Sequence, residues 1–241
     1  MPNDFFHFKQ FSIHQQYCAM KVCTDACLFG AWTASSIINK KLPGSNILDI
    51  GAGTGLLSLM LAQQLDNSII HAIEIDAAAA RQSGENFAAS PWHEQLKVFN
   101  TSIQSFSPTQ QYDFIITNPP FFQNDLASQN AQRNVALHSH QLSLEDLIAA
   151  IQTHLSPQGH FAVLLPYHRT KSFEVLAIGS GFYLQQKTLV HQTPIHACFR
   201  SMLLFGRKQE EVKQVTIVIK DASGNYTEAF VSLLKDYYLY L

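Results

Sequence analysis

The chain has 241 residues, of which 46% are hydrophobic and 14% are charged; this composition supports one folded domain with a sizeable core and excludes a disordered chain. Its formal charge of −2 argues against strong nonspecific binding of nucleic acid, although a local basic rim remains compatible with it. No apolar run is long enough to span a bilayer, and the first residues lack the basic start and apolar core of a signal peptide. We therefore expect a cytoplasmic protein without membrane contact.

The cysteines and histidines show no pattern typical of a metal site. The four cysteines form no C-x-x-C pair, and reduced thiols in the core of a cytosolic protein account for them. His138 and His140 stand two residues apart, but no third ligand follows at a useful spacing. We expect no metal.

Strands and helices alternate along most of the chain. Residues 5–17 are predicted to form a short hairpin, and residues 25–38 a helix capped around Thr24. Seven strands are then predicted at 46–50, 69–75, 96–100, 112–117, 160–165, 182–190 and 201–206, and helices at 56–65, 77–89, 143–155 and 168–178. This alternation predicts an α/β fold with a mostly parallel sheet covered by helices on both faces.

No linker or internal repeat divides the chain, so we expect residues 1–241 to form a single domain. Residues 1–40 would supply the hairpin and first helix, and residues 41–241 the core. The longest stretch without a periodic pattern, 121–142, predicts a functional or mobile loop.

The first core strand, 46–50, leads into a turn with three alternating glycines, Gly51, Gly53 and Gly55. Glycines let a backbone approach a ligand closely, and the apolar helix that follows offers free N–H groups at its start. Leu56 occupies the place where the dinucleotide fingerprint needs its third glycine. The spacing therefore argues against a nicotinamide or flavin enzyme.

Two acidic residues accompany this turn. Asp49 directly precedes the glycines, where it would orient the loop or meet a cationic group of a ligand. Glu74 lies near the end of the next strand, 19 residues after Gly55. An acid at the end of the second strand is well placed to bind both hydroxyls of a ribose.

A second strand-to-turn signal is the sequence Asn118-Pro119-Pro120-Phe121, which follows the buried strand 112–117. Pro119 removes a backbone donor and holds Asn118 extended at the strand's carboxyl end. The Asn118 amide oxygen and a proline carbonyl would accept both hydrogens of a planar amino group, while Phe121 would stack on its ring. An ordinary Pro-Pro turn is the alternative, but the order of glycine turn, acid and Asn-Pro-Pro-Phe favours a site.

These motifs together resemble class I S-adenosylmethionine-dependent methyltransferases of the Asn-Pro-Pro-aromatic group, which modify exocyclic amino or amide nitrogens. The resemblance implies a Rossmann-like domain in which Glu74 holds the ribose of S-adenosylmethionine and the Asn118 turn holds the target amine. The cofactor's amino-acid end would lie against Asp49, Gly51, Ala52, Gly53 and Gly55. Ser102 stands near the place of the acid that meets the cofactor's adenine in that family, so adenine recognition would depend on the backbone around Ile103 or on another polar group.

The two ends of the chain resemble a narrower group within this family. Residues 5–32 look like the opening of the bacterial tRNA(Val) adenine-37 N6-methyltransferases, and residues 225–239 look like their C-terminal helix. The resemblance implies that the N-terminal 40 residues fold over the cofactor, with Thr24 in contact with it, and that 201–206 is an antiparallel last strand. It also implies methyl transfer to N6 of adenine 37 in a tRNA anticodon loop.

The expected partner is thus a tRNA rather than DNA, and we expect a monomer. Candidate phosphate contacts are the basic residues near the predicted site, although each is more often an ordinary surface charge: Lys9, Lys21, Arg133 and Arg200, with Arg169 and Lys171 beside them. An N2-guanine methyltransferase of ribosomal RNA remains open as an alternative. A protein-glutamine methyltransferase is a weaker one, because those enzymes carry a helical domain before the core and only 48 residues precede Asp49. An alternative from a different functional class, an RNA-binding module without catalytic activity, also remains open.

Overall fold

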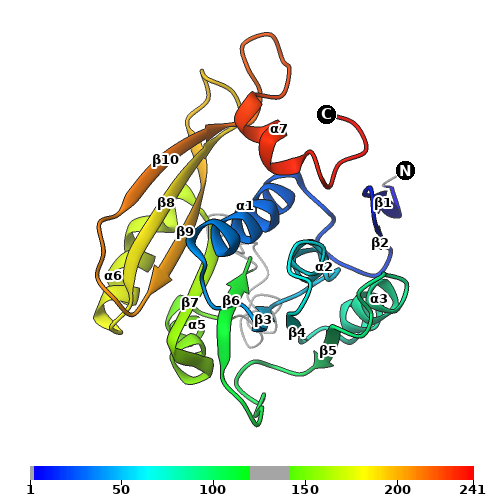
Figure 1. The fold of residues 1–241 in the computed structure, drawn as a ribbon, viewed down its shortest axis with the longest axis vertical. Helices are drawn as coiled ribbons and strands as arrows, with labels where there is room; N and C mark the ends of the chain where they lie inside the picture. The colour runs from blue at the N-terminus through cyan, green and yellow to red at the C-terminus, as the bar shows by residue number, and fades with distance from the viewer. Residues whose placement is uncertain (1–2, 120–141) are drawn as a thin grey trace, which may run out of the picture.

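The computed structural model describes residues 3–119 and 142–241. A central sheet separates two layers of helices, as Figure 1 shows. Helices α1 (Thr24–Lys40), α2 (Leu56–Ala62), α3 (Ala77–Ala88) and α7 (Glu228–Leu234) pack with one core cluster. Helices α5 (Leu144–His154) and α6 (Thr170–Gly179) cover the other face. The predicted α/β architecture is confirmed.

The sheet has eight strands in the order β10-β8-β9-β7-β6-β3-β4-β5. Their bounds are β3 Asn46–Ile50, β4 Ile69–Glu74, β5 Leu96–Asn100, β6 Tyr112–Thr117, β7 Leu155–Pro166, β8 Tyr183–His191, β9 Cys198–Gly206 and β10 Lys213–Val218. Strand β9 runs antiparallel to both β7 and β8, and every other pair is parallel. The predicted antiparallel strand at 201–206 is therefore confirmed.

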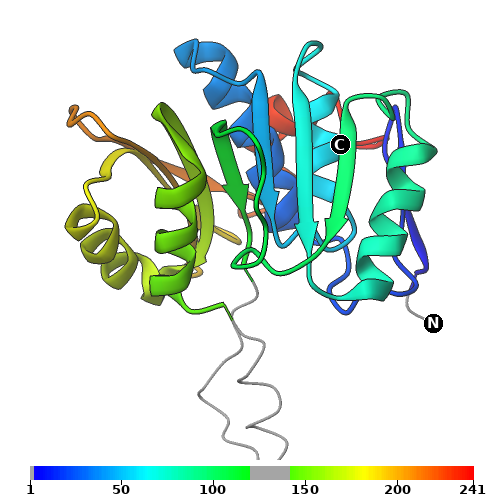
Figure 2. The same cartoon turned by 90° about the horizontal axis from the view of Figure 1, so that it is seen from below.

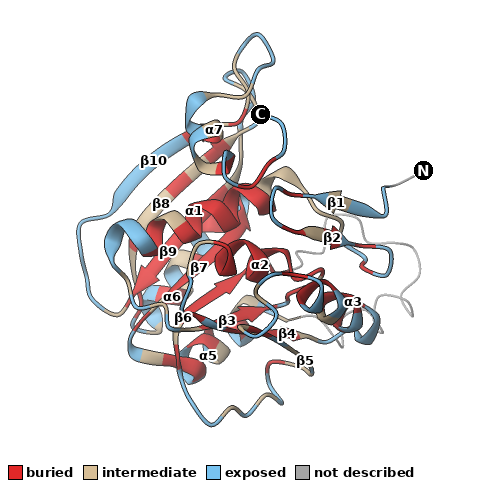
Figure 3. Ribbon diagram, turned by 45° about the vertical axis from the view of Figure 1, so that its right-hand side comes forward, coloured by how far each residue is buried: buried red, intermediate tan, exposed pale blue. Residues whose placement is uncertain are grey.

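The count of seven strands was wrong, because β10 adds an eighth at the edge beside β8. The first four of its six residues are exposed, as the pale ribbon in Figure 3 shows. The sequence of β10 does carry a strand signal, since residues 215–218 are the β-branched Val, Thr, Ile and Val. The strand could therefore have been predicted from the sequence.

The helix termini explain why the elements begin where they do. Helix α3 is capped by Asp76, whose Oδ1 accepts from the Ala79 N–H at 2.8 Å, and α5 by Ser143, whose hydroxyl accepts from the Asp146 N–H at 3.0 Å. Helix α1 begins after Cys23, which makes no side-chain cap bond. No helix within the described residues is long and apolar enough to cross a membrane.

The N-terminal hairpin, β1 (Phe5–His7) with β2 (Ser12–His14), packs beside the glycine turn. Asn86 of α3 joins the two segments: its Oδ1 accepts from the His14 N–H, and its Nδ2 donates to the carbonyls of His14 and Thr54, all at 2.9 Å. Asn86 is almost fully buried. The hairpin is thereby held next to the turn that follows β3.

Candidate active site

The carboxyl ends of the parallel strands form one edge of the sheet, seen with the arrowheads pointing downward in Figure 2. The glycine turn follows β3, Glu74 ends β4 and Asn118 follows β6, and these three strands are neighbours in the sheet. Open α/β sheets bind their ligands at this edge. The predicted motifs are thus brought to one place.

Left-handed backbone occurs at all three turn glycines, with φ of 77° at Gly51, 55° at Gly53 and 81° at Gly55. A Cβ added at Gly51 or Gly53 would meet no atom within 4 Å, so these two residues face open space. A Cβ at Gly55 would come within 2.5 Å of the Phe87 ring and 2.8 Å of the Ser83 hydroxyl. Gly51 and Gly53 therefore leave room for a ligand, whereas Gly55 allows α3 to pack closely.

Glu74 fixes the glycine turn to the end of β4. Its Oε2 accepts from the Gly53 N–H at 2.8 Å, and its Oε1 accepts from the Asp76 N–H at 2.9 Å. The N–H groups of Gly51 and Ala52 both donate to the Ile73 carbonyl, at 2.9 and 3.0 Å. The carboxylate is consequently oriented before any ligand arrives, and each oxygen keeps acceptor capacity for a hydroxyl.

Asp49 lies below the turn with none of its surface exposed. Its Oδ2 accepts from the Ser58 hydroxyl at 2.7 Å, and its Oδ1 has no partner among the described residues. Burial, opposed by the bonds from Ser58 and reinforced by the charge of Glu74, raises the pKa of Asp49 to about 7. A cation near this carboxyl would favour its charged form.

Segment 15–21 runs beside Glu74. Burial, followed by the charge of Glu74, raises the pKa of the Cys18 thiol to about 11. Lys21 donates to the Gln15 carbonyl, and the Tyr17 N–H donates to the Gln82 side chain at 2.8 Å. This part of the N-terminal region therefore flanks the end of β4.

The end of β5 shapes the other side of Glu74. Asn100, paired with Glu74 in the sheet, donates from Nδ2 to the carbonyls of Glu74 and Ile75 at 2.9 and 3.1 Å. The Ser102 hydroxyl donates to the Ser105 hydroxyl at 3.0 Å and accepts from its N–H at 3.2 Å, and Ile103 is buried. The Ser102 hydroxyl therefore makes its hydrogen bonds within its own turn.

Asn118 is half-buried directly after β6, and Pro119 is buried behind it. The preceding Thr117 donates from Oγ1 to the Ile50 carbonyl at 2.9 Å. This buried bond joins the end of β6 to the end of β3, one residue before Gly51. Asn118 therefore emerges next to the glycine turn.

The comparisons with known proteins agree with this geometry. Residues 20–176 match the family model described as a methyltransferase small domain. The tRNA1(Val) (adenine(37)-N6)-methyltransferase of Dyadobacter fermentans is 43% identical over 245 residues, covering 99% of each chain. That of Pseudoalteromonas translucida is 38% identical over 234 residues, covering 97% of this chain and 98% of its own.

The chain belongs to the tRNA1(Val) (adenine(37)-N6)-methyltransferase family.

Solved structures with the same fold are more distant. A protein from Agrobacterium tumefaciens described as a predicted O-methyltransferase superposes with a TM-score of 0.67 at 15% identity, covering 88% of this chain and 96% of its own. A methyltransferase from Pyrococcus furiosus gives 0.52 at 18% identity, covering 74% and 82%. These likenesses concern the fold alone, and they confirm the class I methyltransferase architecture.

Three of the basic residues predicted to contact RNA, Lys9, Lys21 and Arg200, bond to other parts of the protein. Arg200, at the start of β9, donates from Nε to Asp25 Oδ2 of α1 at 2.7 Å. Burial opposes the charge of Asp25, but bonds from Cys23 and Arg200 hold the pKa of its carboxyl below the usual value. Lys9 donates to the Lys235 carbonyl at 2.6 Å, near the C-terminus. Arg133, Pro120 and Phe121 lie outside the described residues.

Several residues that shape the site were missed from the sequence. Asn86, Asn100 and Thr117 each bond to the backbone of a strand end or turn at the site. Of these, only Asn100 could have been predicted from the sequence, because it is the last residue of β5 and β5 lies next to β4, which ends at Glu74. Among the described residues, no group of three or more potential ligands would hold a metal.

Proposed function

We propose that this protein transfers a methyl group from S-adenosylmethionine to the exocyclic N6 of adenine 37 in the anticodon loop of tRNA-Val. The observation that carries the proposal is the meeting of the Glu74-bound glycine turn and Asn118 on neighbouring strand ends. The names of its relatives support the choice of substrate. We further propose that it acts as a cytoplasmic monomer.

The residues at the edge fit this cofactor. Gly51 and Gly53 face open space, Glu74 presents an oriented carboxylate for vicinal hydroxyls, and the buried Asp49 has a free oxygen close to the turn. Two carboxyl groups suit a ligand with an ammonium and a sulfonium charge. When bound, S-adenosylmethionine supplies a methyl group that its sulfonium charge has already activated. Segment 15–21 and Thr24 would cover it, and the backbone near Ser102 and Ile103 would meet its adenine.

Asn118 and Pro119 would prepare the acceptor. The Asn118 amide oxygen accepts one hydrogen of the adenine amine and the Pro119 carbonyl accepts the other, which draws the nitrogen lone pair out of the ring and makes it nucleophilic. That nitrogen would form the new bond to the methyl carbon as the carbon's bond to sulfur breaks, and it would then release one proton to water. Catalysis rests on positioning, and the cost of turning the base out is low in an anticodon loop because the base is already partly unpaired.

The test compares modified nucleosides in tRNA from cells with and without the protein, and in bulk tRNA labelled with isotopic methyl by the purified protein. We expect loss of N6-methyladenosine at position 37 and its restoration in vitro. Loss of N2-methylguanosine from ribosomal RNA, or label in protein glutamine, would replace the proposal with one of those alternatives. Cofactor binding without any transfer would identify an inactive RNA-binding module.

A further inference from the structure

The chain turns a corner where β7 meets α6, next to the proposed acceptor site. The 3₁₀ turn η1 (Tyr167–Arg169) follows β7 directly and leads into α6. Strands β6 and β7 are neighbours, with Thr117 opposite Val163, so β7 continues past the level of Asn118 before the corner begins. The corner therefore lies at the same edge of the sheet as Asn118, on the neighbouring strand.

The corner is rigid because both of its flanks are anchored. The Thr170 hydroxyl is buried and lies 2.5 Å from the Ser201 hydroxyl of β9. Phe173, one turn into α6, is fully buried in the core, and Pro166 pairs with Arg200 in the sheet. The backbone from which the corner's side chains project is therefore fixed without a ligand.

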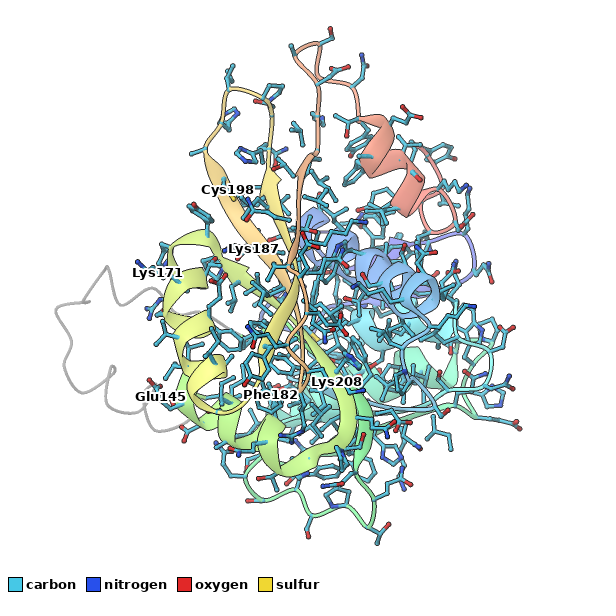
Figure 4. All side chains as sticks on the ribbon, turned by 60° about the vertical axis from the view of Figure 1, so that its left-hand side comes forward. Glu145, Lys171, Phe182, Lys187, Cys198 and Lys208 are labelled. Carbon is cyan, nitrogen blue, oxygen red and sulfur yellow. The ribbon has the colours of Figure 1, made fainter. Side chains whose placement is uncertain are left out.

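Those projecting side chains are aromatic and basic. Tyr167 is 47% exposed, His168 and Lys171 are exposed, and Arg169 is partly exposed. A tyrosine ring next to cationic groups offers a stacking surface and phosphate contacts together. The neighbouring helix, α5, carries Glu145 and Asp146 in its first turn, and Figure 4 shows Glu145 on the same side of the molecule as Lys171.

Charge is distributed unevenly along the chain, and part of the unpaired positive charge lies at the corner. Segment 155–208 contains a single acidic residue, Glu174, and six basic ones: Arg169, Lys171, Lys187, Arg200, Arg207 and Lys208. Lys187 pairs with Glu174 at 2.6 Å and Arg200 with Asp25 at 2.7 Å. Within the described part of the chain, the other four make no ion pair, and two of them, Arg169 and Lys171, lie at the corner.

We propose that the β7–α6 corner, formed by Tyr167, Arg169 and Lys171, binds the RNA strand adjacent to the acceptor base. Tyr167 stacks on a neighbouring base of the loop, and Arg169 and Lys171 contact the phosphates on either side. Single-stranded RNA loops fit this chemistry because their splayed bases stack on aromatic side chains. The inference rests on the proposed function, since the RNA is the one that carries the methylated adenine.

Lys208 provides a matched control. It is an exposed lysine after β9, whose last residue, Gly206, pairs with His160 near the start of β7, so it belongs to the opposite edge of the sheet. Figure 4 shows Lys171 and Lys208 well apart. Lys208→Ala removes the same charge as Lys171→Ala, and the bond from Gln185 to the Lys208 carbonyl survives because it uses the backbone.

The experiment measures the binding of bulk tRNA at several salt concentrations, together with KM for tRNA. The double variant Arg169→Ala/Lys171→Ala should bind tRNA about tenfold more weakly than the wild type, and its slope of log K against log salt should be smaller by about 1.5. Lys171→Ala alone should reduce that slope by about 0.7. Tyr167→Ala should weaken binding about tenfold, whereas Tyr167→Phe keeps the ring and binds normally. Lys208→Ala should match the wild type.

S-adenosylmethionine binding by calorimetry separates a folding defect from a lost contact, and all variants should keep it. Unchanged affinity and slope in the double variant, or equal losses in Lys208→Ala, would overturn the inference while the proposed function stood. If the variant of the exposed Lys171, Lys171→Ala, binds tRNA with the wild-type slope, Lys171 makes no phosphate contact. Absence of methyl transfer to tRNA by the wild type is a separate result, and it removes the proposed function itself.

Discussion

The two halves of the carboxyl edge are built differently. In the cofactor half, the glycine turn, Glu74 and Asn100 are joined by hydrogen bonds between side chains and backbone. In the acceptor half, Asn118 depends on the register of β6 and on one bond from Thr117. The first half is thus held by several bonds between the ends of three neighbouring strands, and the second by a single bond between two strands.

Substitutions in the two halves should therefore have different effects. A change in the cofactor half disturbs a closed set of bonds, so stability and cofactor affinity respond together. A change in the acceptor half leaves those bonds intact and affects turnover. The variants below separate the two halves, beginning with the largest expected effect.

Gly55→Ala should lower the free energy of unfolding by roughly 2–5 kcal/mol, through left-handed backbone strain and overpacking against Phe87. Gly51→Ala has a similar φ but meets no neighbour, so it should cost less stability and mainly weaken cofactor binding. Urea unfolding of both variants checks this. Equal losses would mean that contact with α3 is not what requires glycine at position 55.

Asn118→Ala should lower kcat at least ~10-fold, because a pre-organised acceptor is typically worth a few kcal/mol in the transition state. The affinity for S-adenosylmethionine should change little, since none of the bonds that hold the glycine turn involves Asn118. Single-turnover methyl transfer to tRNA and calorimetry give the two quantities. Normal turnover would remove Asn118 from the mechanism.

The positions of the glycine turn and of Glu74 at neighbouring strand ends were predictable from the sequence, and the reason is physical. Alternating glycines and an acid at a strand end are local patterns, and the central strands are apolar runs. The ion pair between Arg200 and Asp25 joins residues far apart in the chain, and no local sequence pattern predicts it. Strand β10 differs, because its β-branched residues at 215–218 are a local strand signal, and its omission was an error of prediction rather than a limit of the sequence.

Glu74→Ala should weaken S-adenosylmethionine binding by roughly 1.5–3 kcal/mol, the range for a lost charge-assisted hydrogen bond. Two backbone donors, the N–H groups of Gly53 and Asp76, also lose their acceptor, so a small loss of stability should accompany it. Calorimetry and thermal unfolding measure the two effects. Unchanged cofactor affinity would mean that Glu74 only holds the glycine turn and does not bind the cofactor.

Asp49→Asn should change how stability depends on pH. The folded protein holds the Asp49 carboxyl at a pKa of about 7 against a usual value of 3.8, so the folded state keeps a proton that the unfolded state has released. Wild-type stability from this group therefore falls as pH rises above 3.8, and the fall ends once pH passes about 7.

Between pH 6 and pH 8 the wild type should lose roughly 1 kcal/mol relative to Asp49→Asn, whose amide does not ionise and can still accept from Ser58. Urea unfolding of both proteins at the two pH values gives this difference, because every other titrating group is shared and cancels. A constant difference would show that Asp49 is already ionised at pH 6. In that case the carboxyl would be charged before any ligand arrives, and the cofactor half would hold a fixed pair of negative charges.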